Sequence, residues 1–175
     1  KSKASVRFIG RKKEMQILQT IIDEVSTENK SRTVYISGSA GIGKSRLAAE
    51  LKRQNEKYNW CTLPCDEVLQ KSFSPIAHFL KEYFSDKKTF TSEYKTLINS
   101  VSNSNIKNEL IRTESVIADL RNIRRKNSVF SQMDAKSKYT NTVFAVINFF
   151  IALASENPLI LQIEDVHKAD NDTIL

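Results

Sequence analysis

The chain's clearest signal is Thr33-Val34-Tyr35-Ile36-Ser37-Gly38-Ser39-Ala40-Gly41-Ile42-Gly43-Lys44-Ser45, an apolar run that ends in a turn holding three of the four glycines. The β-branched and aromatic residues at its start predict a short buried strand. The good helix formers that follow predict a helix over Lys44–Asn55. The turn between them matches G-x-x-x-x-G-K-[ST] in full, and a strand before it and a helix after it are the context that this motif requires.

The chemistry of a polyphosphate site explains why these residue types recur at this spacing. Backbone N–H groups wrap the phosphates, and glycine lets the main chain approach them closely. The helix that follows directs its N-terminal amides and the positive end of its dipole at the anion. Lys44 supplies a charge for the β- and γ-phosphates, and the Ser45 hydroxyl reaches Mg²⁺. The sequence therefore predicts a nucleotide site at Gly38–Ser45.

A second candidate feature is the acid pair Glu164-Asp165, which follows a predicted strand over Leu159–Ile163. A nucleotide site of this kind needs a carboxylate at a neighbouring strand end to hold Mg²⁺ directly or through water. A second acid there can polarise the attacking water. Acids after buried strands also serve as plain helix caps. The phosphate-binding motif about 120 residues upstream favours the catalytic interpretation.

The rest of the chain reads as helices around one further strand, at Tyr58–Leu63. Residues 64–157 form a predominantly helical connecting region, with order least certain over Lys126–Ser137, and the role of residues 85–137 is open. The predicted helices are Met15–Val25, Ile76–Phe84, Tyr94–Val101, Glu114–Arg125 and Thr140–Ser155. The last is apolar almost all round, which predicts a buried core helix.

Composition excludes some classes of protein. A mean hydropathy of -0.39 argues against an integral membrane protein, and the longest apolar run, Val143–Ala154, is too short to span one. Lys1–Gly10 carries no apolar segment typical of a secretory signal, so we expect a cytoplasmic protein. Cys61 and Cys65 are best interpreted as reduced thiols, because no second half of a zinc site follows them.

The net charge of +7 favours polyanionic partners such as nucleotides, nucleic acid or acidic lipid. One basic cluster lies near the start of the chain, and a second comprises Arg121, Arg124, Arg125 and Lys126. Charge runs usually only solvate a surface, and this is the favoured interpretation here. Phe8 is the one aromatic residue among them, which weakens the case for a single-strand stacking surface.

Three motifs together resemble one family, and they occur in its order and rough spacing. They are Phe8-Ile9-Gly10-Arg11-Lys12-Lys13-Glu14, Gly38–Ser45 with Arg46-Leu47, and Pro158–Asp165 with Val166-His167-Lys168-Ala169-Asp170. The chain is similar to the AAA-type ATPase module of the signal-transduction ATPases with numerous domains (the STAND class), as attached to bacterial transcriptional regulators, adenylate cyclases and kinases. Phe73-Ser74-Pro75 resembles an aromatic-x-Pro element of the family. Two residues depart from its pattern: Glu164 stands where Asp is frequent, and Lys168 where Trp is usual.

The resemblance implies an α/β P-loop NTPase fold, a three-layer sandwich with a parallel sheet and a helical insertion between its second and third strands. Phe8–Arg11 would lie against adenine and ribose, Glu164 and Ser45 would serve Mg²⁺, and Asp165 would lie beside the attacking water. Lys44 and Asp165 are the implied catalytic residues, and the cofactors are ATP or ADP with Mg²⁺. The implied nucleotide-binding residues are Phe8, Ile9, Gly10, Arg11, Gly38, Ser39, Ala40, Gly41, Ile42, Gly43, Lys44, Ser45 and Arg46.

Three functions remain open at this point. The leading one is a slow regulatory ATPase, a nucleotide-dependent conformational switch whose partners are sensor and output domains of the same chain, with self-oligomerisation possible. The second is a DNA-handling AAA ATPase of the origin-recognition or loader type, although this segment alone is not expected to bind nucleic acid. The third is a nucleotide-binding scaffold with little or no turnover.

The same resemblance predicts that residues 1–175 are the N-terminal part of one ATPase domain in a larger regulator. In this class the fourth strand lies between the first and the third. The strand before Gly38 and the strand before Glu164 are therefore expected to lack direct pairing, and the sheet to be incomplete at its C-terminal side.

Overall fold

The computed structural model describes residues 10–28, 30–66, 71–155 and 157–174, and the chain divides into two compact units. Unit 1 comprises residues 1–58 and unit 2 comprises residues 59–175. Unit 1 contains two helices and unit 2 contains a small sheet with helices, so the described part of the chain is mixed α/β.

In unit 1 the helices α1 (Lys12–Glu28) and α2 (Lys44–Gln54) pack against each other. Leu18 of α1 and Leu47 and Leu51 of α2 are their buried residues. Asn55, which ends α2 and is 2% exposed, exchanges two amide hydrogen bonds with Gln19 at 2.8 and 3.2 Å. A buried amide costs free energy unless it is paired, so this exchange fixes how the two helices meet.

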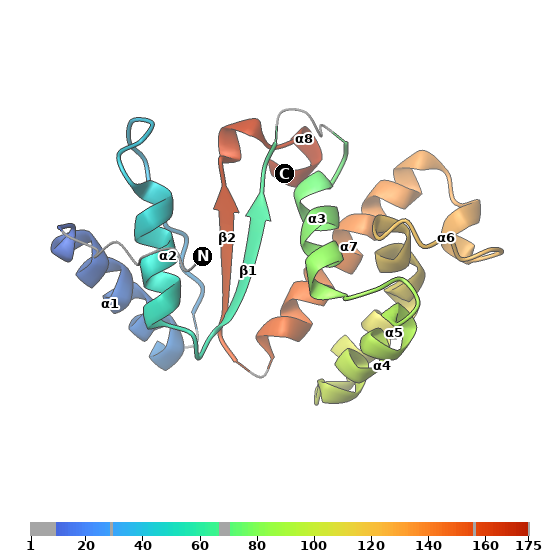
Figure 1. The fold of residues 1–175 in the computed structure, drawn as a ribbon. Helices are drawn as coiled ribbons and strands as arrows, with labels where there is room; N and C mark the ends of the chain where they lie inside the picture. Colours follow the sequence, from blue (N-terminus) through green and yellow to red (C-terminus); the bar gives the residue numbers. More distant parts are fainter. Residues whose placement is uncertain (1–9, 29, 67–70, 156, 175) are drawn as a thin grey trace, which may run out of the picture. The chain divides into compact units, whose positions relative to one another are not determined.

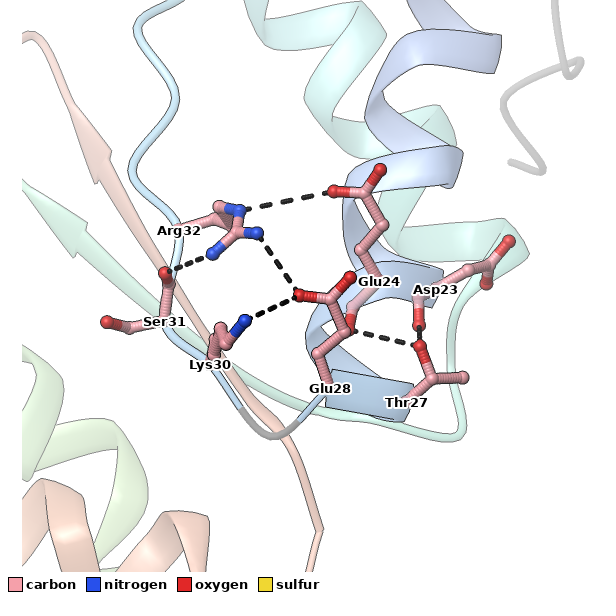
Figure 2. Close-up of polar contacts among 7 residues, drawn as sticks. All are labelled: Asp23, Glu24, Thr27, Glu28, Lys30, Ser31 and Arg32. Carbon is pink, nitrogen blue, oxygen red and sulfur yellow. Dashed lines mark hydrogen bonds and ion pairs between the residues drawn. The ribbon is translucent and has the colours of Figure 1, made fainter.

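The segment between these helices corrects the first predicted strand. Residues 30–39 form no strand, and Tyr35 is 85% exposed. Figure 2 shows the ion pairs at the start of this segment. Arg32 and Lys30 pair with Glu28 of α1 at 3.4 and 3.3 Å, and Arg32 also pairs with Glu24 at 4.0 Å. Exposed ion pairs of this kind contribute little. The strand prediction for Thr33–Ser37 was wrong because β propensity alone cannot satisfy backbone groups, and unit 1 offers no described strand to pair with.

Unit 2 is built on two parallel strands, β1 (Asn59–Pro64) and β2 (Leu159–Glu164) (Figure 1). They pair in register from Asn59 opposite Leu159 to Pro64 opposite Glu164. Both lie within one residue of their predicted positions. The hydrogen-bonded pairing therefore joins segments 100 residues apart and brings Pro64 beside the acid pair.

The connection between the strands is helical, as predicted. It consists of α3 (Ser74–Tyr83), α4 (Phe90–Ser100), α5 (Ser104–Leu120), α6 (Val129–Gln132) and α7 (Ala135–Ala154). After β2 come the 3-10 turn η1 (Val166–Lys168) and the short helix α8 (Asn171–Ile174). Parallel strands require a long crossover, and here the crossover supplies most of the core of unit 2.

Aromatic side chains dominate that core. Phe84 lies 4.8 Å from Phe90 and 6.0 Å from Phe149, ring centre to ring centre, which ties α3, α4 and α7 together. Tyr94 is buried beside them and donates its hydroxyl to the Leu110 carbonyl of α5 at 3.0 Å. Burial raises the pKa of Tyr94 far above the ordinary range, so it stays a neutral donor.

The helix boundaries differ from their predictions where capping residues decide them. α5 begins at Ser104, ten residues before the predicted Glu114, because Asn103 accepts hydrogen bonds from the Asn105 and Ile106 amides. It ends at Leu120, since Asn122 adopts a positive φ of 56° and its amide donates to Asp119. Residues 126–137 are more ordered than predicted, because Ser128 caps α6 and Asp134 caps α7.

α7 corrects the prediction of a helix buried all round. One face packs on α5, but Phe144, Ile147 and Ile151 are 54, 48 and 44% exposed. Their i, i+3, i+7 spacing places them on one stripe. Within the described residues, no helix has the length and apolar character needed to cross a membrane.

Candidate functional site

The glycine-rich turn of unit 1 has the backbone that its sequence requires. Gly41 and Gly43 have φ values of 76° and 93°, which L side chains adopt with strain, and the space that a Cβ would take is open at both. Gly43 directly precedes Lys44, the first residue of α2, and no side chain caps the helix there. The amides at the start of this 11-residue helix therefore stay available to an anion.

Two cationic side chains organise this turn. The Lys44 ammonium donates to the carbonyls of Gly38 and Ser39 at 2.9 and 3.1 Å, so it lies across the loop. The Arg11 guanidinium donates to the Ile42 carbonyl at 2.7 Å. Arg11 directly precedes α1, and this hydrogen bond places its side chain at the glycine-rich turn. Its predicted contact with adenine and ribose stays a prediction. Ser45, beside Lys44, is exposed at the start of α2.

The remaining predicted residues of this half of the site are placed as follows. Gly10 adjoins Arg11 with a φ of 86°, and Arg46 is exposed on the first turn of α2. Ser39 and Ala40 lie in the exposed loop. A Cβ added to Gly38 would lie 3.1 Å from the Ile42 side chain, so a larger residue at position 38 would crowd it. Phe8 and Ile9 lie outside the described residues.

Arg11→Ala is expected to weaken ATP binding about fivefold. The variant loses the hydrogen bond that holds the Ile42 carbonyl, so the loop is less ordered before ATP binds and part of the binding free energy is used to order it. Titration calorimetry on the two proteins measures this. Arg53→Ala, on the exposed far end of α2, removes the same charge without touching the loop and should bind ATP as the wild type does. Equal affinity in both variants would contradict the role of Arg11.

The acid pair ends β2 in unit 2. A Glu164 carboxylate oxygen accepts from the Gln162 side-chain amide at 2.7 Å, and the Glu164 carbonyl accepts from the Cys65 amide. Asp165 adopts a left-handed conformation, φ 51°, which turns the chain sharply out of the strand. Its side chain is 57% exposed, and Lys168 lies 3.8 Å away. Both carboxylates are therefore presented at the carboxyl end of a parallel strand, where ligands bind in open α/β sheets.

Asp170 is the residue whose role the sequence did not disclose. Its carboxylate is buried and accepts hydrogen bonds from the backbone amides of Phe73, Ser74 and Thr173 at 3.0–3.2 Å. It also accepts one from the Ser74 hydroxyl at 3.4 Å and one from the Thr173 hydroxyl at 2.8 Å. Phe73, with φ 60°, occupies the N-cap position of α3 and gives that helix no side-chain cap. Asp170 thus caps α3 from 97 residues away.

This cap fixes the segment that follows the acid pair. Glu164 lies six positions before Asp170, so the carboxylate ties the turn beyond β2 to the start of α3. Burial by itself raises the pKa of Asp170, but the hydrogen bonds from Thr173, Phe73 and Ser74 outweigh it and hold the pKa below its ordinary value. One signal could have pointed to it: Phe73-Ser74-Pro75 begins a helix with an aromatic residue where an Asp, Asn, Ser or Thr cap is typical.

The two cysteines and His167 are further residues of a type that can bind a metal ion. Cys61 and Cys65 are buried thiols that form no disulfide, and burial raises the pKa of Cys65. In the part of the chain that the structure describes, no three His, Cys, Asp or Glu side chains gather in a way that could hold a metal ion. His167 lies exposed in η1.

A comparison with protein families identifies the chain. The model of the AAA ATPase domain matches residues 7–174, so the chain belongs to this family. The match takes in the glycine-rich turn, the helical connection and the acid pair. No curated protein and no solved structure matched the chain. The chain is therefore a nucleotide-binding ATPase module.

The residues of unit 1 fit the triphosphate and Mg²⁺ that this family generally uses. Gly41 and Gly43 leave room for a ligand against the backbone, and the uncapped start of α2 offers amides to it. Lys44 is held by two exposed carbonyl contacts, which phosphate oxygens can replace at little cost. When bound, Mg²⁺ would neutralise phosphate charge beside the Ser45 hydroxyl.

Proposed function

We propose that this module is a slow regulatory ATPase that works as a nucleotide-dependent conformational switch. The observation that carries the proposal is the glycine-rich turn, with Lys44 folded across it and Arg11 bonded to Ile42. A site built this way distinguishes ATP from ADP through contacts that only the γ-phosphate makes. The principal contact is made by Lys44, since its ammonium must break its hydrogen bonds to the Gly38 and Ser39 carbonyls to bind the γ-phosphate.

The motif resemblance to the STAND class supports the regulatory part of the proposal. In that setting the module lies in the cytoplasm, within a larger protein whose sensor and output domains respond to the bound nucleotide. Leu161 and Ile163 are 44 and 46% exposed on β2, while their register partners Cys61 and Leu63 are buried. This exposure supports a larger parallel sheet, completed by further strands into a three-layer sandwich.

In the proposed reaction Asp165 orients the attacking water and Glu164 serves the Mg²⁺ side. Asp165 suits this role because its side chain is largely exposed and makes one weak ion pair with Lys168.

Asp165→Asn is expected to lower steady-state phosphate release about 100-fold while leaving ATP affinity within about twofold, because the amide cannot accept a proton from water. A coupled phosphate assay and a calorimetric titration measure the two quantities. Asp172→Asn, which removes the same charge from α8, serves as the control. Loss of binding in Asp165→Asn would contradict the assignment.

One measurement separates the switch from a scaffold without turnover. The protein is purified without added nucleotide and denatured, and the released nucleotide is identified. ADP in near-equal amount supports a switch that has hydrolysed its ligand. Intact ATP in near-equal amount, together with no phosphate release by the wild type, supports the scaffold and contradicts hydrolysis.

A further inference from the structure

The second basic cluster of the sequence lies in a short ordered connection of unit 2. Asn122 ends α5 with its amide on the Asp119 carbonyl, and Ile123 donates to the Ala118 carbonyl, a Schellman arrangement. A second turn follows, with Asn127 at φ 60° and the Ser128 amide on the Arg125 carbonyl at 3.3 Å. These two turns hold Arg124, Arg125 and Lys126 between α5 and α6.

Arg125 anchors this connection to α4 and α5. Its guanidinium forms an ion pair with Glu114 of α5 and donates to the Thr91 hydroxyl of α4 at 2.7 Å. It also lies over the Phe90 ring at 5.8 Å. Arg125 is therefore neutralised and fixed in place, and it anchors the backbone that presents its two neighbours.

Arg124, Lys126 and Lys138 differ from Arg125, because none of them forms an ion pair with any described residue. All three line one pocket of about 260 Å³, to which Lys138 comes from the first turn of α7. Asp119 is the one unpaired carboxylate in its lining. Three cations against one carboxylate leave a net positive charge, which a concave surface concentrates.

Hydroxyl groups complete the lining. Ser115, Ser128 and Ser131 line the same pocket, and the Ser131 hydroxyl donates to the Ser128 carbonyl at 2.6 Å. The Ser128 oxygen accepts from the Ser131 amide at 3.1 Å, which leaves its own proton without a described acceptor. Ammonium, guanidinium and hydroxyl donors together suit phosphate oxygens. The pocket volume of about 260 Å³ is large enough for a phosphate group.

We propose that this pocket, which we name the α5–α7 pocket, binds a phosphate group of a small anionic ligand. It is separate in sequence from the glycine-rich turn and does not depend on the ATPase assignment. Nucleic acid suits it less well, because Phe130, the aromatic residue of the lining, is 8% exposed and offers no stacking surface.

The test is an amide NMR titration of the 175-residue protein with inorganic phosphate, at ionic strength held constant with chloride. Saturable shifts of Lys126, Ser128 and Ser131 are expected, and they are read separately from those of Gly41 and Gly43. The double variant Arg124→Gln/Lys126→Gln should weaken phosphate binding at the pocket about tenfold or more, since it removes two charged donors. Lys81→Gln/Lys95→Gln removes the same charge from α3 and α4 and should leave it within about twofold.

Three outcomes would overturn the proposal. Shifts at the pocket that chloride reproduces would show charge screening only. An equal loss of affinity in the Lys81→Gln/Lys95→Gln control would assign the effect to net charge. Duplex DNA binding that is steeply weakened by salt and abolished in Arg124→Gln/Lys126→Gln, without saturable phosphate shifts, would assign the pocket to nucleic acid instead. A variant that fails to fold is recognised by a loss of dispersion in its amide spectrum. In that case the charge-conserving variant Arg124→Lys/Lys126→Arg is tested instead, and it is expected to bind phosphate as the wild type does.

Discussion

Lys44→Ala is expected to weaken ATP binding about 100-fold, because the variant loses two hydrogen bonds from a cation to phosphate oxygens. The folded protein should change little, because the two bonds that Lys44 makes to Gly38 and Ser39 are exposed and alanine is a good residue for the first turn of α2. Titration calorimetry with ATP and Mg²⁺ at fixed ionic strength measures the affinity.

Lys52→Ala is the matched control for this variant. Lys52 is an exposed lysine near the other end of the same helix, so the change in net charge is identical. Its affinity for ATP should stay within about twofold of wild type. If Lys44→Ala and Lys52→Ala bound ATP equally well, the phosphate role of Lys44 and the proposed switch would both be wrong.

Asp170→Ala is expected to lower the free energy of unfolding of unit 2 by about 3 kcal/mol. The change leaves the buried Phe73 amide without its acceptor, and each unsatisfied buried donor costs about 1–3 kcal/mol. Urea unfolding followed by Trp60 fluorescence measures it. Trp60 is the one tryptophan and lies in β1, so the signal reports on unit 2.

Asp170→Asn separates the charge from the hydrogen bonds and sets the pH dependence. Its folded-state pKa lies below the ordinary 3.8, so the carboxylate stabilises the fold above pH 3.8 and loses this effect as the pH falls through the lower, folded-state pKa. The stability difference between wild type and Asp170→Asn should therefore be constant near neutral pH and shrink below pH 3.8.

Asp172→Ala, on α8 beside Asp170, is the control and should change stability by about 0.5 kcal/mol or less. A stability difference between wild type and Asp170→Asn that persisted unchanged at low pH would show that geometry rather than ionisation holds the cap. Equal stability of wild type and Asp170→Ala would remove the cap altogether.

Local signals in the sequence were sufficient wherever neighbours along the chain decide the structure. The glycine positions of the turn, the start of α2 at Lys44 and both paired strands follow from spacing and residue type. The start of α5 was missed although Asn103 is a good cap and Ile106 and Leu110 carry the apolar face of the helix back toward it. The strand prediction at Thr33–Ser37 was wrong for a different reason, since residue type predicts extended backbone but not a partner.

The sequence by itself determined the glycine-rich turn, because its glycines, Lys44 and Ser45 lie within a few residues of one another. It also determined that an acid pair ends the strand β2. Only the tertiary structure showed that Arg11 bonds to Ile42, that Asp170 caps α3, and that Lys138 joins Arg124 and Lys126 in one pocket. These contacts join residues 12 to 97 positions apart, and such distances are closed by packing of whole elements rather than by local propensity.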